Sequence, residues 1–194
     1  MIRAGVGRLT RRLALALALL FPLIGGPAFA AVEVSFYSRE LGTNFPHAFV
    51  GLKGTVDATG EVVDTSLGFT AQNVSPAILF GAVRGEVVVE GEEQIRRSVR
   101  QFAVTLTDEQ YRTVMRLVEE WRNAPQPSYR LRQHSCVHFV SAIAAVIGLR
   151  VDNSQRLMNR PRSFLERVRE LNPQLAASAP AAVGASAGTN VSAP

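Results

Sequence analysis

Cysteine is almost absent from this sequence, since its 194 residues include a single one, Cys136. A lone thiol excludes a disulfide within the chain, which is the usual form of cysteine in exported proteins. The thiol is therefore a buried apolar filler, a bridge to another chain, or a reactive group. The sequence around Cys136 has to distinguish these three possibilities.

The sequence also lacks an apolar run long enough to be a good membrane span. Its longest apolar stretch, residues 13–24, follows four arginines and is interrupted by Pro22. An A-x-A motif that ends at Ala30 comes next, and this motif is typical of signal-peptide cleavage. We therefore predict a signal peptide over residues 1–30 and a periplasmic or secreted mature chain, exported by the general secretory route, with no stable membrane span. The alternative is an uncleaved anchor.

An excess of one charge sign is missing as well, once the leader is set aside. The whole chain has 21 basic and 16 acidic residues, but four arginines and no acidic residue lie in the first thirty positions. The mature chain keeps 17 basic and 16 acidic residues, a net charge of +1. We therefore expect no nucleic-acid partner. Arginines between residues 150 and 169 alternate with acidic residues and are interpreted as a solvated helix face.

Aromatic and large apolar side chains are scarce at the end of the chain. Residues 172–194 are rich in alanine, serine and proline and contain no aromatic residue. Such a segment buries too little apolar surface to offset its ordering entropy, so we predict a disordered tail. The remaining residues, 31–171, are enough for one domain with a single core.

The spacing of apolar residues changes once along the mature chain. Alternation between turn residues indicates strands at 32–38, 45–56, 61–70, 79–90 and 99–106. From Thr107, which forms a capping box with Gln110, the apolar spacing is helical. We predict helices from there to about residue 124, at 136–147 and, opening with Pro161, at 161–171. The predicted fold is α+β, a small antiparallel sheet with packed helices.

Cys136 stands at the first position of the predicted apolar helix. Unpaired N–H groups give a helix N-terminus a partial positive charge, which favours a thiolate over a thiol. The same groups can hold a developing oxyanion. His47 is the best candidate for the base of such a nucleophile, because it lies within an otherwise apolar strand.

Two segments carry a resemblance to a known superfamily. Residues 45–52, Phe-Pro-His-Ala-Phe-Val-Gly-Leu, resemble the histidine strand of circularly permuted papain-like proteins. Residues 129–131, Tyr-Arg-Leu, and 135–140, Ser-Cys-Val-His-Phe-Val, resemble their cysteine segment. The second segment is most similar to the Asn-Cys-x-His-Phe-Val segment of the lecithin:retinol acyltransferase-like group. His47 precedes Cys136, as in the permuted members, whereas the parent NlpC-like order is reversed.

The resemblance implies a role for each matching residue. Cys136 would be the nucleophile and His47 the base that activates it. A third polar group on the following strand would orient the imidazole, and the acyltransferase-like group has a second histidine there, which is missing here. Thr70, Ser66, Asp64 and Gln72 are substitutes. Pairing about the turn at residues 57–60 places His47 opposite roughly Phe69, so Thr70 or Gln72 fits best. Ser135 also departs from the asparagine of that group.

Other readings of the histidines and the cysteine remain open. His47 can be a hydrogen-bonded core histidine, and Cys136 a small buried hydrophobe. His134 is an alternative base in the connector before the helix, and His138 is interpreted as structural. Zinc ligation by Cys136, His134 and His138 does not match the usual ligand spacings, so we expect no metal and no cofactor.

Two classes of function follow. The first is a monomeric cysteine-dependent amidase or peptidase that acts on a cell-envelope amide, with peptidoglycan peptides as the most abundant candidate. A lipid acyltransferase or thioesterase is its variant. The second is a non-catalytic envelope binding module of the same fold, and the missing second histidine and Ser135 favour it.

Overall fold

Six strands form one antiparallel sheet in the computed structural model, which describes residues 31–40, 45–125 and 128–177. The order across the sheet is β5-β1-β2-β3-β4-β6. The strands are β1 (Val32–Arg39), β2 (His47–Thr55), β3 (Val62–Ala71), β4 (Val83–Val89), β5 (Val99–Leu106) and β6 (Ser128–Tyr129). Sheet and helices are segregated along most of the chain, so the α+β prediction is confirmed.

Three of the helices lie where the sequence predicts them, at residues 108–122, 136–146 and 161–171. The helices are α2 (Glu92–Arg96), α3 (Asp108–Arg122), α4 (Cys136–Val146), α5 (Pro161–Leu171) and α6 (Gln174–Ala177), with a short 3₁₀ turn, η1 (Pro76–Leu79). The capping box at the start of α3 is present, since Thr107 Oγ1 accepts from the Gln110 backbone N–H at 3.2 Å and Gln110 Oε1 accepts from the Thr107 N–H at 3.0 Å. After α4 the chain turns at Gly148, whose φ of 91° favours glycine.

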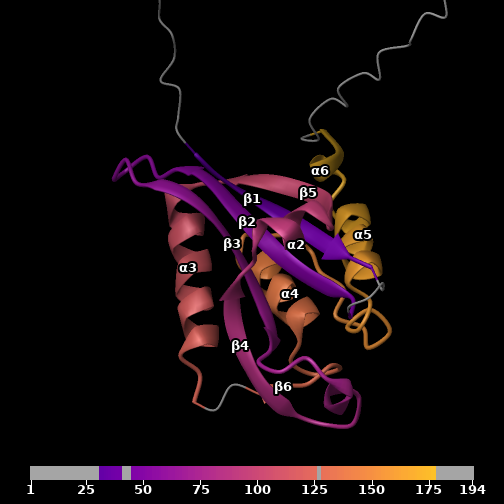
Figure 1. Cartoon of the computed structure of the whole chain (residues 1–194). Coiled ribbons are helices and arrows are strands. Elements are labelled where there is room, and N and C mark those ends of the chain that lie inside the picture. Colours follow the sequence, from indigo (N-terminus) through magenta and orange to yellow (C-terminus); the bar gives the residue numbers. More distant parts are fainter. Residues whose placement is uncertain (1–30, 41–44, 126–127, 178–194) are drawn as a thin grey trace, which may run out of the picture.

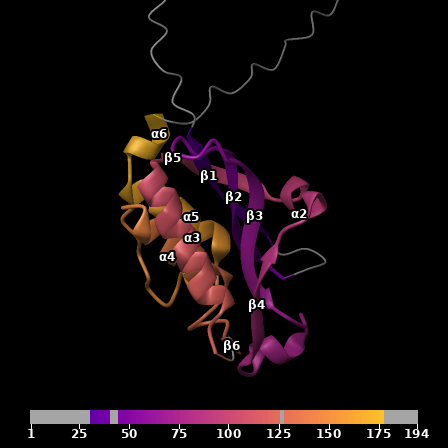
Figure 2. The ribbon, with the colours of Figure 1, turned by 90° about the vertical axis from the view of Figure 1, so that its left-hand side faces the viewer.

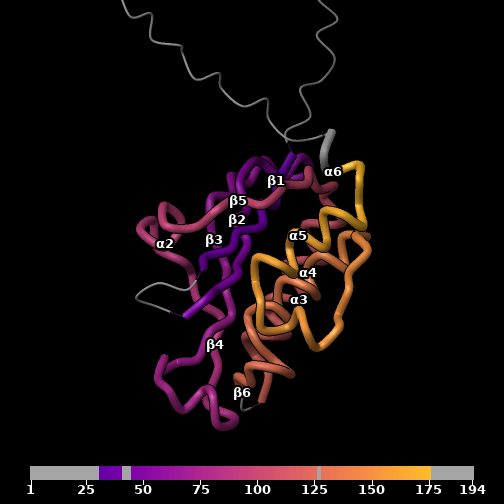
Figure 3. Tube along the Cα trace, turned by 90° about the vertical axis from the view of Figure 1, so that its right-hand side faces the viewer, coloured from indigo at the N-terminus to yellow at the C-terminus, as the bar shows by residue number. Residues whose placement is uncertain are grey.

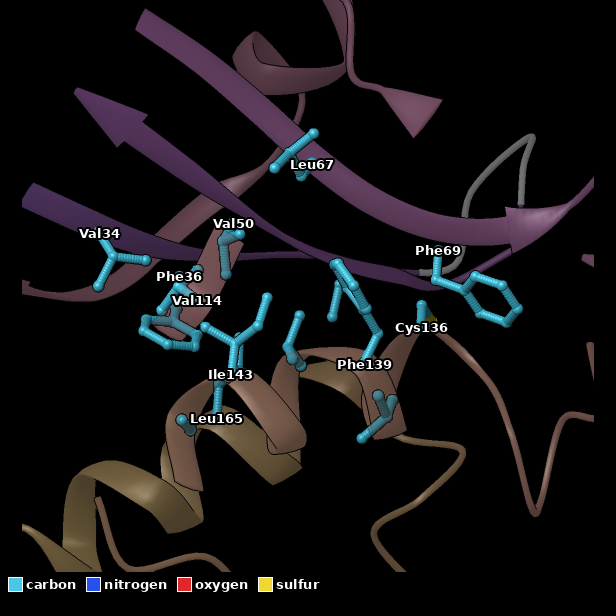
Figure 4. Close-up of a cluster of buried hydrophobic side chains, with 14 of the residues drawn as sticks. Val34, Phe36, Val50, Leu67, Phe69, Val114, Cys136, Phe139, Ile143 and Leu165 are labelled. Carbon is cyan, nitrogen blue, oxygen red and sulfur yellow. The ribbon is translucent and has the colours of Figure 1, made fainter. Parts of the chain in front are cut away.

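The helices lie unequally on the two faces of the sheet. Figure 1 shows α3, α4 and α5 packed together, and the edge-on views of Figures 2 and 3 show the sheet between this helix layer and α2. We call the side toward α3, α4 and α5 the covered face and the opposite side the outer face. The main core fills the space between the covered face and the helices, as Figure 4 shows for Val34, Val50, Ile143 and Leu165.

The β2–β3 pairing differs by one residue from the sequence prediction. The ladder pairs Phe49 with Gly68 and runs to Thr55 and Val62, closed by a hydrogen bond from Val56 N to Glu61 O at 2.9 Å. A shift of one residue moves every side chain to the other face of a strand. Phe69 therefore does not lie opposite His47. Its side chain points into the core, where it is fully buried.

The C-terminal boundary also differs from the prediction. Asn172 is only 2 % exposed, and its side chain bonds to the backbone N and O of Arg150 and to the carbonyl of Val168. Leu175 on α6 is 5 % exposed. The packed domain thus extends at least to Leu175, and the predicted signal peptide and residues 178–194 of the predicted tail lie outside the described residues. No helix among the described residues combines the length and apolar character needed to cross a membrane.

Candidate active site

The thiol of Cys136 lies at the N-terminus of α4, as the sequence predicts. This helix is apolar almost all round because it packs between β2, β3 and the neighbouring helices α3 and α5. Cys136 is 2 % exposed and lies next to Phe69 at the end of the core cluster, where Figure 4 shows it beyond Phe139. The packing of α4 therefore fixes the position of the sulfur relative to the start of β2.

His47 is the first residue of β2 and 8 % exposed. The β2–β3 ladder begins two residues later, at Phe49, and the His47 ring stacks on Phe49 with centroids 5.9 Å apart. Its Nε2 lies 2.7 Å from Glu90 Oε1, and both side chains are about nine-tenths buried. With Nε2 engaged by a carboxylate, Nδ1 is the ring nitrogen left for the thiol.

Glu90 reaches His47 across a strand. It follows β4 and pairs with Ser66 of β3, whose hydroxyl donates to the Glu90 carbonyl at 2.7 Å. Gly68 lies against both groups, since a Cβ there would overlap Glu90 Oε1 and come within 3.0 Å of His47 Nε2. Because Gly68 has no side chain, the Glu90 carboxylate, which follows β4, can contact His47 of β2.

Cys136, His47 and Glu90 shift one another's charge states in the same sense. Burial by itself would lower the pKa of His47, but its interactions with Cys136 and Glu90 and their negative charges raise it from 6.5 to about 9. Burial by itself would raise the pKa of the Cys136 thiol, but the interaction with His47 and its positive charge outweigh it and hold the pKa below the ordinary value. Both shifts favour a thiolate beside an imidazolium, the form of an activated cysteine nucleophile.

Two further groups contact the sulfur. The backbone N–H of Ala48 interacts with it and helps to lower the pKa of the thiol. The Tyr129 hydroxyl lies 3.9 Å away and donates toward Sγ. Burial and the charge of Cys136 raise the pKa of Tyr129, so this hydroxyl stays protonated. A protonated hydroxyl beside the nucleophile, together with the N–H groups that open α4, is suited to hold an oxyanion.

The third polar residue is not one of those that the sequence indicated. Thr70 is half-buried and lines the cavity beside His47, while Gln72 is exposed and its backbone N–H bonds to Arg84 O at 2.9 Å. In the described part of the chain, the hydrogen-bond partner of His47 is Glu90. A glycine inside an otherwise regular strand, Gly68, is the sequence signal for this close approach.

The other two histidines have structural contacts. The His134 ring stacks on Trp121 with centroids 4.1 Å apart, and its Nδ1 bonds to Ser128 O at 2.9 Å. His138 Nδ1 accepts from the backbone N–H of Ser135 at 3.3 Å and lies 2.9 Å from its hydroxyl, so it orders the start of α4. Among the described residues, no group of three or more metal-ligating side chains is close enough to hold an ion.

A cavity of about 290 Å³ opens beside this site. Its polar wall includes Arg39, His47 and Glu90, and Tyr129 also lines it. Its apolar wall comes from the segment before β2 and from the loop around η1, and includes Phe45 and Ile78. The imidazole and the carboxylate thus face a space in which a small part of a substrate fits.

Comparison of the chain with protein-family models, with curated proteins and with solved structures gives no match.

Proposed function

We propose that this chain is an exported cysteine-dependent amidase or peptidase with a permuted papain-like arrangement of its catalytic groups. The observation that supports the proposal is that Cys136 at the start of α4 interacts with a buried imidazole, His47, whose Nε2 is engaged by Glu90 at 2.7 Å. A structural cysteine needs neither a helix N-terminus nor an imidazole held by a carboxylate, and the burial of all three groups costs free energy that only their interaction offsets.

The first half of the reaction forms an acyl-enzyme. The thiolate of Cys136 attacks the amide carbonyl, so that a C–S bond forms and the oxygen becomes an oxyanion. The Tyr129 hydroxyl and the N–H groups at the start of α4 stabilise that charge. The C–N bond then breaks, and the imidazolium of His47 gives its proton to the leaving amine.

The second half releases the acyl group. His47, now neutral, takes a proton from water, and the hydroxide attacks the thioester carbonyl. A C–O bond forms, the C–S bond breaks, and the thiolate and imidazolium are restored. Glu90 acts through the imidazole and is a positioning residue, because it fixes the ring and favours its protonated form.

The substrate class follows from the compartment and from the resemblance. The predicted signal peptide would direct the chain to the cell envelope, where peptidoglycan peptides are the most abundant amides. The order of the histidine strand and the cysteine helix is that of the permuted papain-like superfamily. We therefore propose a cell-envelope amide, with peptidoglycan peptides as the first substrate to test.

The test combines thiol chemistry with product analysis. Iodoacetamide should alkylate Cys136 of the purified protein at pH 6, where an ordinary thiol of pKa about 8.5 is almost fully protonated. Incubation with purified peptidoglycan should release new amino termini, detected by mass spectrometry, and Cys136→Ser should abolish that release while the protein stays folded. A folded protein whose thiol reacts only above pH 8 would overturn the proposal in favour of a binding module.

One observation favours acyl transfer or thioester hydrolysis on a lipid as the second candidate. The loop around η1, whose Ile78 lines the cavity, exposes Val74 to 58 %, Leu79 to 57 % and Phe80 to 87 %. Exposed apolar side chains next to a site suit an apolar substrate. Release of fatty acid from a lipid thioester or ester, with no release of amine from peptidoglycan, would select this candidate.

A further inference from the structure

Arg39 lies beside the site and has no role in the chemistry described above. It is the last residue of β1, and the β1–β2 register pairs it directly with His47. Directly opposite residues of an antiparallel pair point to the same face, with Cβ atoms about 5 Å apart. The guanidinium therefore enters the cavity next to the imidazole, and it lines that cavity together with His47 and Glu90.

The contacts of Arg39 leave its charge uncompensated. Its guanidinium donates to Gln94 Oε1 on α2 and to the Phe45 carbonyl at 3.0 Å, and both acceptors are neutral. Its Nε is buried and has no hydrogen-bond partner among the described residues. No carboxylate in the described part of the chain forms an ion pair with it, and residues 41–44, which follow closely, include no acidic side chain.

Glu90 does not neutralise Arg39, although both line the cavity. The Glu90 carboxylate is engaged at 2.7 Å by His47. The thiolate of Cys136 likewise has its own counter-charge in the imidazolium. A half-buried guanidinium without a counter-ion loses part of its hydration and gains no Coulomb energy in return. An incoming anion would offset that loss, and a planar carboxylate matches the fork of an arginine.

We propose that Arg39 binds a carboxylate of the substrate, so that the enzyme selects amides that carry a free carboxylate close to the scissile bond. This inference rests on the proposed function of Cys136 and His47. Gln94 and the Phe45 carbonyl hold the guanidinium in place, and the apolar wall of the cavity reduces the screening of its charge by water. The carboxylate is the part of the substrate that Arg39 recognises, and Cys136 attacks the neighbouring carbonyl.

A pair of alkylating agents tests this without knowledge of the substrate. Iodoacetate and iodoacetamide attack the same sulfur and differ only in that one carries a carboxylate where the other carries a neutral amide. The ratio of their rate constants at Cys136, divided by the same ratio for free cysteine, measures the preference for the anion. We expect a ratio above one that falls about tenfold in Arg39→Gln, the effect of one charge-assisted contact.

Two variants control the measurement. Arg39→Lys keeps the charge but not the fork, so it should retain only part of the preference, and it also tests whether a changed residue at this position still folds. Arg112→Gln removes the same charge from an exposed position on α3. The neighbouring Gln110 bonds to Ile147 O, which lies at the C-terminal end of α4, whereas Cys136 opens that helix. Arg112 is therefore far from Cys136. This variant should leave the ratio unchanged.

The outcomes separate this inference from the proposed function. If both agents react quickly at pH 6 and the ratio is the same in the wild type and in Arg39→Gln, the carboxylate site is overturned and the cysteine chemistry stands. An equal fall in Arg112→Gln also overturns it, because the preference would then reflect net charge. If neither agent reacts below pH 8, the proposed function fails and this inference with it.

Discussion

The two faces of the sheet differ in what they stabilise. On the covered face, side chains such as Phe36, Val50 and Phe69 are fully buried against the helix layer and make apolar contacts. The outer face carries polar groups, among them His47, Ser66 and Glu90, and is covered over a small part by α2. Burial of apolar area is the main source of folding free energy, so the covered face holds the fold together and the outer face is free to carry charge.

The candidate site lies where the two faces meet. Cys136 comes from the helix layer, whereas His47 and Glu90 are supplied by strands and share the outer face with Arg39. The covered face positions the nucleophile through the packing of α4, and the outer face sets its charge state. Substitutions on the two faces should therefore affect different quantities, the free energy of unfolding in one case and the reactivity of the thiol in the other.

The largest effect is expected for His47→Gln. The amide keeps an N–H donor for Glu90 but cannot exchange protons, so turnover should fall by about 10²–10⁴-fold, the usual contribution of a general acid–base group. The pKa of Cys136 should rise only part of the way to its ordinary value, because Ala48 N–H and the Tyr129 hydroxyl still contact the sulfur. Turnover and the pH dependence of alkylation measure both effects.

The matched control for that variant is His134→Gln. Loss of the ring that stacks on Trp121 should reduce stability while the pH dependence of alkylation stays as in the wild type. An equal loss of thiol reactivity in both variants would contradict the assignment of His47 as the partner of Cys136.

On the covered face, Phe36→Ala should act on stability alone. Phe36 is fully buried and stacks on Phe102 with centroids 4.7 Å apart, so its truncation should cost about 3–5 kcal/mol of unfolding free energy. Denaturant titration measures that loss. Cys136 in the folded fraction should be alkylated as in the wild type.

The control is Val99→Ala on β5, at a position 60 % exposed, which should change stability by less than about 0.5 kcal/mol. A shifted thiol pKa in Phe36→Ala would show that the faces are coupled.

A smaller effect on turnover is expected for Gly68→Ala. The new Cβ would displace the Glu90 carboxylate, which is the end of a flexible side chain and can swing away without unfolding the sheet. A displacement of about 1 Å in a positioning group can cost about 10²-fold in turnover. Gly51→Ala on β2 is the control, since its Cβ would meet only the ring of Tyr37 at 3.2 Å. Equal losses in the two variants would contradict the role of Gly68.

The sequence predicted those features of the fold and of the site that depend on residues close together in the chain. Alternation located the strands within a few residues, the Thr107 capping box fixed the start of α3, and Cys136 was placed at a helix N-terminus by the polar connector before it. His47 was visible for the same reason, as a polar side chain in an apolar strand.

Local sequence patterns could not predict which side chains meet across the strands. Glu90 reaches His47 because β3 and β4 pair in one register and because Gly68 has no side chain, and a register error of one residue already placed Phe69 on the wrong face. The ion-pair partner of a histidine 43 positions away has no local signal. Arg39 is subject to the same limit, since its neighbour is set by the β1–β2 register. Likewise, Asn172 in a segment of low apolar content is held by long-range hydrogen bonds.

The smallest expected effect, and the most specific, is a shift in the pH profile. Turnover requires the thiolate of Cys136 and the imidazolium of His47 together. As pH rises through about 9, the pKa of His47, the imidazolium is lost, so kcat/KM should fall on that side. On the acid side kcat/KM should fall only below the ordinary thiol range, because the pKa of Cys136 is lowered. The wild-type profile should therefore be a bell with its alkaline limb near pH 9.

Glu90→Gln tests which carboxylate sets that limb. Glu90 raises the pKa of His47 through a hydrogen bond and its charge, so the amide should move the alkaline limb to lower pH. A less basic imidazole also lowers the pKa of Cys136 less, so the acid limb should move up and the bell should narrow from both sides. Glu86→Gln removes the same charge from β4, beside Thr70 in the register, and should leave both limbs in place. If Glu90→Gln changes the height of the bell but neither limb, the carboxylate only orients the ring. If both variants move the limbs equally, the shift reflects net charge. That result would contradict the statement that specific groups on the outer face set the charge state of Cys136.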